Sequence, residues 1–77
     1  MNFATLVDNE LQQARVAHAA LHSAHEGLAV IQEEVFELQM EVYKRRAARS
    51  NEAMLKELVQ VGAMAQRMAE DLDLIEY

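Results

Sequence analysis

Apolar residues recur every three or four positions along almost the whole chain, and the alternation typical of strands is absent. A spacing of three and four places apolar side chains on one face of an α-helix. Residues that favour helix are frequent, and the 77 residues include no proline and only two glycines. The pattern therefore predicts a single all-α domain over residues 1–77.

Three helices are expected, at about residues 3–20, 24–46 and 52–71. Ser23 is followed three residues later by Glu26, a capping box that starts the second helix. Ser50 or Asn51 caps the third helix. Because the connection between the second and third helices is short, we expect them to be antiparallel neighbours.

Each predicted helix has an apolar face that we expect to be buried. On the first helix the face consists of Phe3, Val7, Leu11, Ala14, His18 and Leu21. On the second it consists of Leu28, Ile31, Val35, Leu38 and Val42. On the third it consists of Met54, Leu58, Val61, Ala65, Met68 and Leu72, and small residues around Gly62 favour close approach of another helix. His18 is expected to be a half-buried packing residue rather than a ligand.

Composition points to self-association. Hydrophobic residues make up 52% of the chain, more than a lone helical unit of this size can bury. The chain has no cysteine, so disulfides and thiolate zinc sites are excluded as sources of stability. We therefore expect the three-helix chain to assemble into a helical-bundle homo-oligomer, a dimer or a tetramer.

Charge and hydropathy exclude several partners. A net charge of −6 argues against nucleic-acid binding through phosphates. No apolar run is long enough to span a bilayer, so no membrane association is expected. The N-terminus lacks the basic start and apolar core of a signal peptide, and a cytoplasmic protein is expected.

Acidic residues line the flank of the second helix. Glu34, Glu37 and Glu41 follow one another at helical spacing, and no lysine occurs before Lys44. Like charges at this spacing repel by a few tenths of a kcal/mol per pair. On the antiparallel third helix, Glu57 with Gln60 one turn later can face them. Such oxygen ligands suit Mg²⁺, or else Mn²⁺; the alternative is surface ion pairs with lysine and arginine, and spacing alone leaves both open.

A basic stretch follows the acidic line, from Lys44 to Arg49. Cations in the last turn of a helix complement its dipole. Alternatively, Lys44 and Arg45 reach the phosphates of a nucleotide, which lysine and arginine bind well.

Two motifs resemble the MazG-type all-α nucleoside triphosphate pyrophosphohydrolases. The first is Glu33-Glu34-Val35-Phe36-Glu37-Leu38, and the second is Glu57-Leu58-Val59-Gln60-Val61. The stretch from His22 to Glu26 is also similar to short bacterial and phage-borne members. The family signature is Glu-x-x-Glu on one helix and Glu-x-x-Asp on the next. The resemblance implies Mg²⁺-dependent cleavage of a nucleotide to a monophosphate and pyrophosphate, in helical dimers or tetramers.

The resemblance also implies roles for residues. It makes Glu34, Glu37, Glu57 and Gln60 the metal ligands, and Glu37 and Glu57 the catalytic residues, without identifying the general base. Gln60 stands where the family has aspartate, and an amide oxygen is a weaker ligand that cannot act as a base. Glu41, Asp71 or a residue from another subunit is expected to compensate. If none does, the chain is a non-catalytic helical oligomerisation module or a nucleotide-binding regulatory module.

Overall fold

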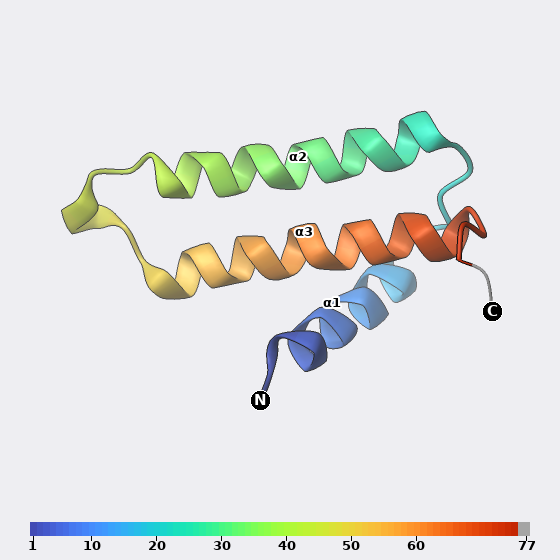
Figure 1. Cartoon of the computed structure of the whole chain (residues 1–77), viewed down its shortest axis with the longest axis horizontal. Coiled ribbons are helices and arrows are strands. Elements are labelled where there is room, and N and C mark those ends of the chain that lie inside the picture. Colours follow the sequence, from blue (N-terminus) through green and yellow to red (C-terminus); the bar gives the residue numbers. More distant parts are fainter. Residues whose placement is uncertain (76–77) are drawn as a thin grey trace.

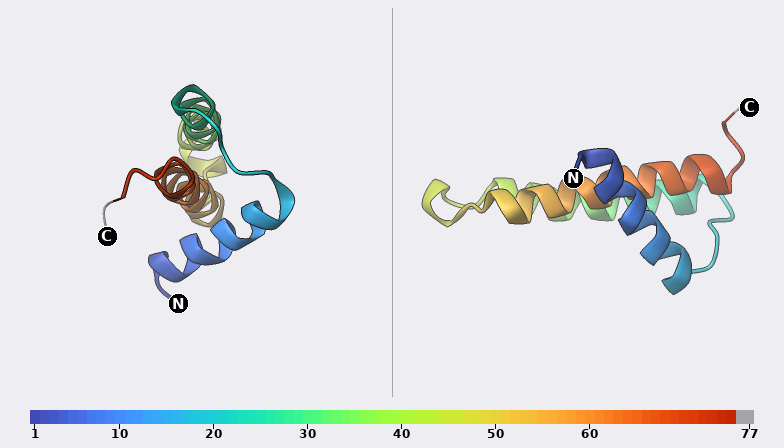
Figure 2. Two further views of the ribbon diagram at one scale, coloured as in Figure 1. Left: turned by 90° about the vertical axis from the view of Figure 1, so that its right-hand side faces the viewer. Right: turned by 90° about the horizontal axis from the view of Figure 1, so that it is seen from below.

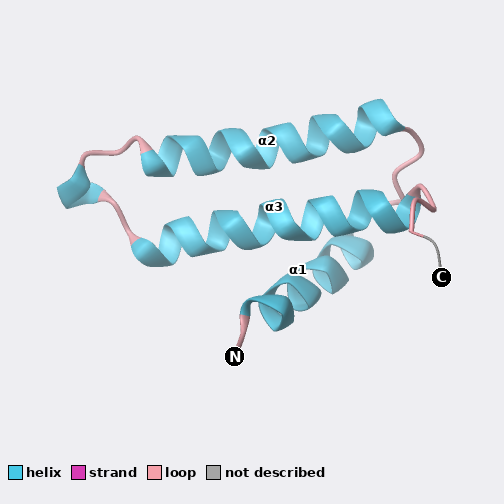
Figure 3. Cartoon of the chain, viewed as in Figure 1, coloured by secondary structure: helices cyan, strands magenta, loops and turns pink. Residues whose placement is uncertain are grey.

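The computed structural model describes residues 1–75, which form three α-helices and one short 3₁₀ turn. The elements are α1 (Phe3–Ala17), α2 (Ala24–Val42), η1 (Arg46–Ala48) and α3 (Asn51–Asp71). Within the described residues no strand occurs, so the predicted all-α fold of three helices is confirmed. Figures 1 and 3 show α2 and α3 as an antiparallel pair, with α1 crossing α3 obliquely.

Each α-helix begins at a side-chain cap. The Asn2 Oδ1 atom accepts a hydrogen bond from the Thr5 backbone N–H at 2.9 Å. The Oγ atoms of Ser23 and Ser50 accept hydrogen bonds from the backbone N–H groups three residues later, both at 3.1 Å. These bonds satisfy donors that the first turn of a helix leaves free. The predicted starts of the second and third helices are therefore confirmed to within a residue.

Two predicted helix ends are too late. α1 ends at Ala17 rather than at residue 20, because the next residues bond to α3 instead of continuing the helix. Arg67 Nη2 donates to the Ala19 carbonyl at 2.7 Å, and the Leu21 N–H donates to Asp71 at 2.9 Å. α2 ends at Val42 rather than at residue 46. Residues 43–50 are all exposed, so packing no longer supports a helix there.

The core lies around α3, which packs against α2 on one side and α1 on the other (Figure 2). From α1 and the segment after it, Val7, Leu11, Ala14 and Leu21 are buried, as predicted. Phe3 is half exposed, and His18 is exposed because α1 ends before it. The expected half-buried position of His18 is therefore wrong.

The predicted apolar faces of α2 and α3 are only partly buried. On α3 the buried side chains are Val59, Ala63, Met64 and Arg67, whereas Leu58 and Ala65 of the predicted face are exposed. On α2, Leu28, Val35 and Val42 of the predicted face are exposed. The reason is that α3 contacts two helices on different sides, which moves its buried surface away from the single predicted stripe. A side chain at Gly62 would place its Cβ 3.1 Å from Val7 Cγ2, so the close helix expected there is α1.

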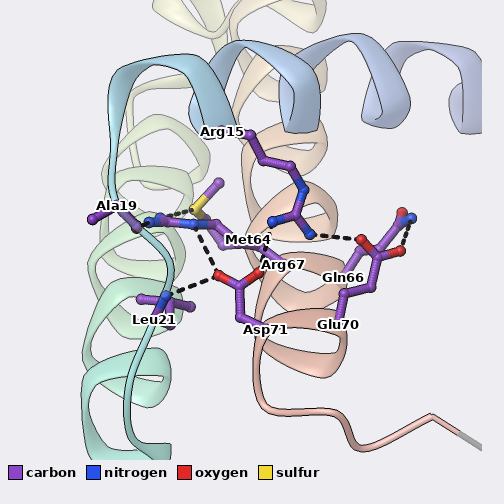
Figure 4. Close-up of polar contacts among 8 residues, drawn as sticks. All are labelled: Arg15, Ala19, Leu21, Met64, Gln66, Arg67, Glu70 and Asp71. Atoms are coloured by element: carbon purple, nitrogen blue, oxygen red, sulfur yellow. Dashed lines mark hydrogen bonds and ion pairs between the residues drawn. The ribbon is translucent and has the colours of Figure 1, made fainter.

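Polar side chains fasten α1 and the segment after it to the end of α3 (Figure 4). Arg15 bonds Asp71 and Glu70, each at 2.6 Å. The Asp71 side chain is only 5% exposed and also accepts the Leu21 N–H, while the Arg67 Nε atom lies 3.7 Å from its Oδ2 atom. Because the buried charges are paired and hydrogen-bonded, burying them is tolerated. We call Arg15, Arg67 and Asp71 the ionic latch.

Within residues 1–75, no helix is both long enough and apolar enough to cross a membrane.

Candidate metal centre

Three glutamates from α2 and α3 converge in the groove between these helices. One carboxylate oxygen each from Glu34, Glu37 and Glu57 lies within 4.8 Å of the other two. Glu34 and Glu37 are one turn apart on α2, and the antiparallel course of α3 brings Glu57 opposite them. The structure thus brings together the three acids that the sequence analysis singled out. We call these three residues the glutamate cluster.

The cluster is partly removed from water. Glu34 and Glu57 are half-buried, and Glu37 is exposed. The Oε2 atoms of Glu34 and Glu57 are buried and have no hydrogen-bond partner. A buried carboxylate oxygen without a partner is costly unless a proton or a cation satisfies it. These two oxygens of the cluster are therefore suited to binding a proton or a cation.

The same crowding changes the acidity of the cluster. Burial, followed by the nearby carboxyl of Glu37, raises the pKa of Glu34 to about 7. Burial is also the largest cause of the raised pKa of Glu57, and the charge on Glu37 adds to it. Both causes disfavour the ionised form. A divalent cation would remove the repulsion and favour full ionisation, since the charge of a bound ion reverses the local effect on pKa.

The side-chain amide of Gln60 bonds to a residue of α1. Its Nε2 atom donates a hydrogen bond to Glu10 Oε1 at 2.8 Å. Glu10 was not expected to take part in the site. No motif marks it, because it is 50 residues from Gln60 in sequence and reaches it only through the crossing of α1 over α3. The role of Gln60 as a metal ligand stays a prediction.

Both acids of this chain proposed to compensate for Gln60 have cationic partners of their own. Glu41 pairs with Lys44 at 2.9 Å. Asp71 belongs to the ionic latch, and its bonds to Arg15 and to the Leu21 N–H lower its pKa. The expectation that Asp71 compensates for Gln60 is wrong, because its buried carboxylate is already neutralised at the far end of α3. Lys44 and Arg45 lie beyond the end of α2, and their contact with phosphates stays a prediction.

A hollow of about 650 Å³ adjoins the cluster. It lies between the end of α1, the segment after it, α2 and α3. Its wall includes Glu34 of the cluster and also Glu10, His18, His22, Gln60 and Arg67. Apolar surface comes from alanines and from Val30 and Met64. The volume is in the range of small-molecule sites, and the shared residue Glu34 makes the hollow and the cluster continuous.

Comparison of the chain with known protein families, with curated proteins and with solved structures finds no match. The resemblance to MazG-type enzymes thus rests on the two motifs and the stretch from His22 to Glu26.

Proposed function

We propose that the chain is a Mg²⁺-dependent nucleotide pyrophosphohydrolase, which cleaves a nucleoside triphosphate to a monophosphate and pyrophosphate. The observation that supports it best is the convergence of Glu34, Glu37 and Glu57 with two buried, unpartnered oxygens. Carboxylate oxygens without histidine or thiolate nearby are the donor set of a hard cation, with Mn²⁺ as the substitute for Mg²⁺. The residues therefore fit the metal that the family resemblance implies.

In this proposal the residues of the chain hold and orient the reactants. Glu34 and Glu57 hold the metal with their buried oxygens, and exposed Glu37 completes the set at the side open to water. When bound, Mg²⁺ neutralises phosphate charge and lowers the pKa of an attacking water. Glu37 and Glu57 are the candidates to orient that water. The hollow beside Glu34 takes the nucleoside part, and Lys44 and Arg45 are the candidates to contact the phosphates.

One observation favours a second candidate function. Gln60 supplies an amide in place of a carboxylate and is bonded to Glu10, which leaves the cluster one acid short of the family signature. A site with three acids can bind Mg²⁺ and nucleotide with little turnover. On this alternative the chain is a non-catalytic, nucleotide-binding regulatory or oligomerisation module.

Self-association is part of the proposal. Within the described residues, only seven hydrophobic side chains are buried, and thirteen large hydrophobic side chains stay exposed. We propose a homo-oligomer, a dimer or a tetramer, because a core this small gives marginal stability.

The test is pyrophosphate release from a broad panel of nucleotides with Mg²⁺ or Mn²⁺. Glu34→Gln, Glu37→Gln and Glu57→Gln should each lower the rate at least tenfold, because each removes a charged ligand while keeping the side-chain size. Glu52→Gln, an exposed change of the same kind on α3, is the matched control and should keep full activity. Circular dichroism checks that each variant is folded. If no nucleotide yields pyrophosphate while Mg²⁺ still binds, the non-catalytic alternative holds.

A further inference from the structure

One face of α3 contributes three residues in a row to the wall of the hollow. Gln60, Met64 and Arg67 follow one another at steps of four and three, and all three line the hollow. Residues at these steps lie on the same face of a helix, and the seven residues from Gln60 to Arg67 cover about 10 Å along its axis. Met64 and Arg67 are buried, and Gln60 is half-buried. This strip therefore has a polar side chain at each end and an apolar thioether between them.

The Gln60 end of the strip presents a hydrogen-bond acceptor. Gln60 Nε2 donates to Glu10 Oε1 at 2.8 Å, and half-buried Glu10 lines the same hollow from α1. This bond holds the carboxylate in place and uses one of its two oxygens. Among residues 1–75 the other oxygen of Glu10 has no hydrogen-bond partner. Because a carboxylate accepts hydrogen bonds and donates none, this end suits an N–H donor of a ligand.

The Arg67 end of the strip presents hydrogen-bond donors. Its Nη2 atom donates to the Ala19 carbonyl at 2.7 Å, whereas the partner of Nη1 is the Met64 sulfur at 3.7 Å (Figure 4). A thioether is a weak acceptor, and a guanidinium has five N–H donors. A buried donor with so weak a partner gains by binding a better acceptor. This end therefore suits a carbonyl oxygen or a ring nitrogen of a ligand.

Between these two ends the hollow is apolar and open. Small side chains leave the space opposite Met64, namely those of Ala14, Ala17, Ala19 and Ala20. A hydrogen bond of about 3 Å at each end of a strip of about 10 Å leaves room for the width of one flat ring with its substituents. The Met64 thioether is suited to contact such a ring.

Charge shows which part of a nucleotide the hollow can take. Its wall contains a single arginine, which already faces a buried carboxylate, and four glutamates: Glu10, Glu26, Glu33 and Glu34. An excess of carboxylates repels phosphates. The occupant is therefore the uncharged part of the molecule, and its hydrogen-bonding edge has to present a donor at one end and an acceptor at the other.

We propose that the hollow selects nucleobases that carry an exocyclic amino group, of the adenine or cytosine kind, and that Glu10 is the residue that determines this specificity. The amino group donates to the free oxygen of Glu10, and an acceptor atom of the base receives a hydrogen bond from Arg67. In hypoxanthine or uracil an oxygen takes the place of the amino group, and in the same position two acceptors face each other without a donor. This inference rests on the proposed function for the placement of the nucleoside in the hollow.

The first experiment compares matched nucleosides that differ at this position, cytidine with uridine and adenosine with inosine. Their binding to the metal-free chain is measured by NMR titration in the presence of a chelator. Cytidine or adenosine should bind at least tenfold more tightly than its counterpart, and the pair that shows the larger ratio identifies the kind of base. A wild type that binds no nucleoside at millimolar concentration, or that binds both members of each pair equally, would overturn the proposal.

The second experiment tests Glu10 itself. Glu10→Gln should remove the preference for the amino group, because an amide can also donate to an oxygen. Asp8→Asn, an exposed change of the same kind on α1, is the matched control and should keep the preference. Ala17→Leu fills the hollow from its exposed rim and should weaken binding of all four nucleosides without changing their ratios. An unchanged preference in Glu10→Gln contradicts the role of Glu10, and undiminished binding by Ala17→Leu contradicts the use of the hollow.

These results can be separated from those on the proposed function. Nucleosides carry no phosphate, and the titration needs neither Mg²⁺ nor turnover. If the wild type discriminates between nucleosides but releases no pyrophosphate, this inference holds and the proposed function fails. If the triphosphates of cytidine and uridine, and likewise those of adenosine and inosine, release pyrophosphate with equal kcat/KM, the proposed function holds and this inference fails.

Discussion

At Glu34, burial affects both protonation and the proposed metal binding. Its carboxyl has a buried oxygen without a partner and a pKa raised to about 7. A proton and a cation satisfy the same oxygen, so each must displace the other. Metal binding at the glutamate cluster should therefore release protons near neutral pH and weaken as pH falls.

The raised pKa of Glu34 predicts how stability changes with pH in the absence of metal. Between pH 4.5, the ordinary pKa, and about pH 7, the folded chain holds the Glu34 proton more firmly than the unfolded chain does. The free energy of unfolding should therefore fall as pH rises through this window. Glu34→Gln removes that dependence and should be more stable than wild type at pH 8 by about 1 kcal/mol, or several degrees in Tm. Thermal melts at several pH values in the presence of a chelator measure both effects.

The matched control for this prediction is again Glu52→Gln, which should keep the wild-type slope because exposed Glu52 lies outside the cluster. If the free energy of unfolding changes with pH equally in wild type and Glu34→Gln, the raised pKa of Glu34 has no effect on stability.

The three residues of the cluster could be identified from sequence, but their surroundings could not. Glu34 and Glu37 are one turn apart on one helix, and a short connection places Glu57 opposite them, so local rules suffice. The bond of Gln60 to Glu10 depends on the angle at which α1 crosses α3. No residue pattern predicts that angle. The same holds for the hollow, since its wall combines four segments of the chain.

At the scale of elements, α1 and the segment after it are held by polar bonds to α3 in addition to apolar packing. The ionic latch ties the residues after α1 to the last turns of α3, through the Ala19 carbonyl and the Leu21 N–H. These long-range bonds end α1 at Ala17, whereas its own residue types favour helix as far as residue 20. The starts of the helices could be predicted because capping bonds are local. The end of α1 is determined by tertiary contacts with α3, and no glycine or proline marks it in the sequence.

Breaking the latch should loosen α1 from the α2–α3 pair. Asp71→Asn keeps the size of the side chain but leaves buried Arg67 without its counter-charge, which costs about 3 kcal/mol. Because bonds to Arg15 and Leu21 lower the pKa of Asp71, the wild type should lose this stability as pH falls below 3.8, the ordinary value. The variant should lack that acid-dependent loss. Urea unfolding at pH 7 and pH 3 measures both.

Asp73→Asn is the control for the latch. Asp73 is exposed two residues later with a φ of 56°, a left-handed conformation that asparagine adopts readily. Its stability should equal that of the wild type. A cost for Asp73→Asn as large as that for Asp71→Asn would show that net charge, rather than the buried pairing, is responsible.

At the scale of the whole molecule, the α2–α3 pair has two sides with different chemistry. One side has the hollow, beside the glutamates and the crossing of α1, and the other has exposed apolar side chains, among them Leu28, Val35 and Leu58. The apolar faces read from sequence for α2 and α3 belong to this second side only in part, because Ile31, Leu38 and Val61 are half-buried. Their burial could not be judged from periodicity, which shows that residues share a face but not how much of that face another helix covers.

Mg²⁺ should stabilise the whole chain if it binds the glutamate cluster as proposed, whereas a purely structural oligomerisation module should be indifferent to Mg²⁺. An ion that binds only the folded state adds about 2.7 kcal/mol at a hundredfold excess over Kd, or on the order of 10 °C or more in Tm for a chain of this length. Glu34→Gln and Glu57→Gln should lose most of the shift, and Glu52→Gln should keep it. At pH 5 the wild-type shift should shrink, because Glu34 is then protonated. Equal shifts for wild type and Glu34→Gln would mean that Mg²⁺ binds elsewhere, and the cluster would then be a set of acids that share a proton.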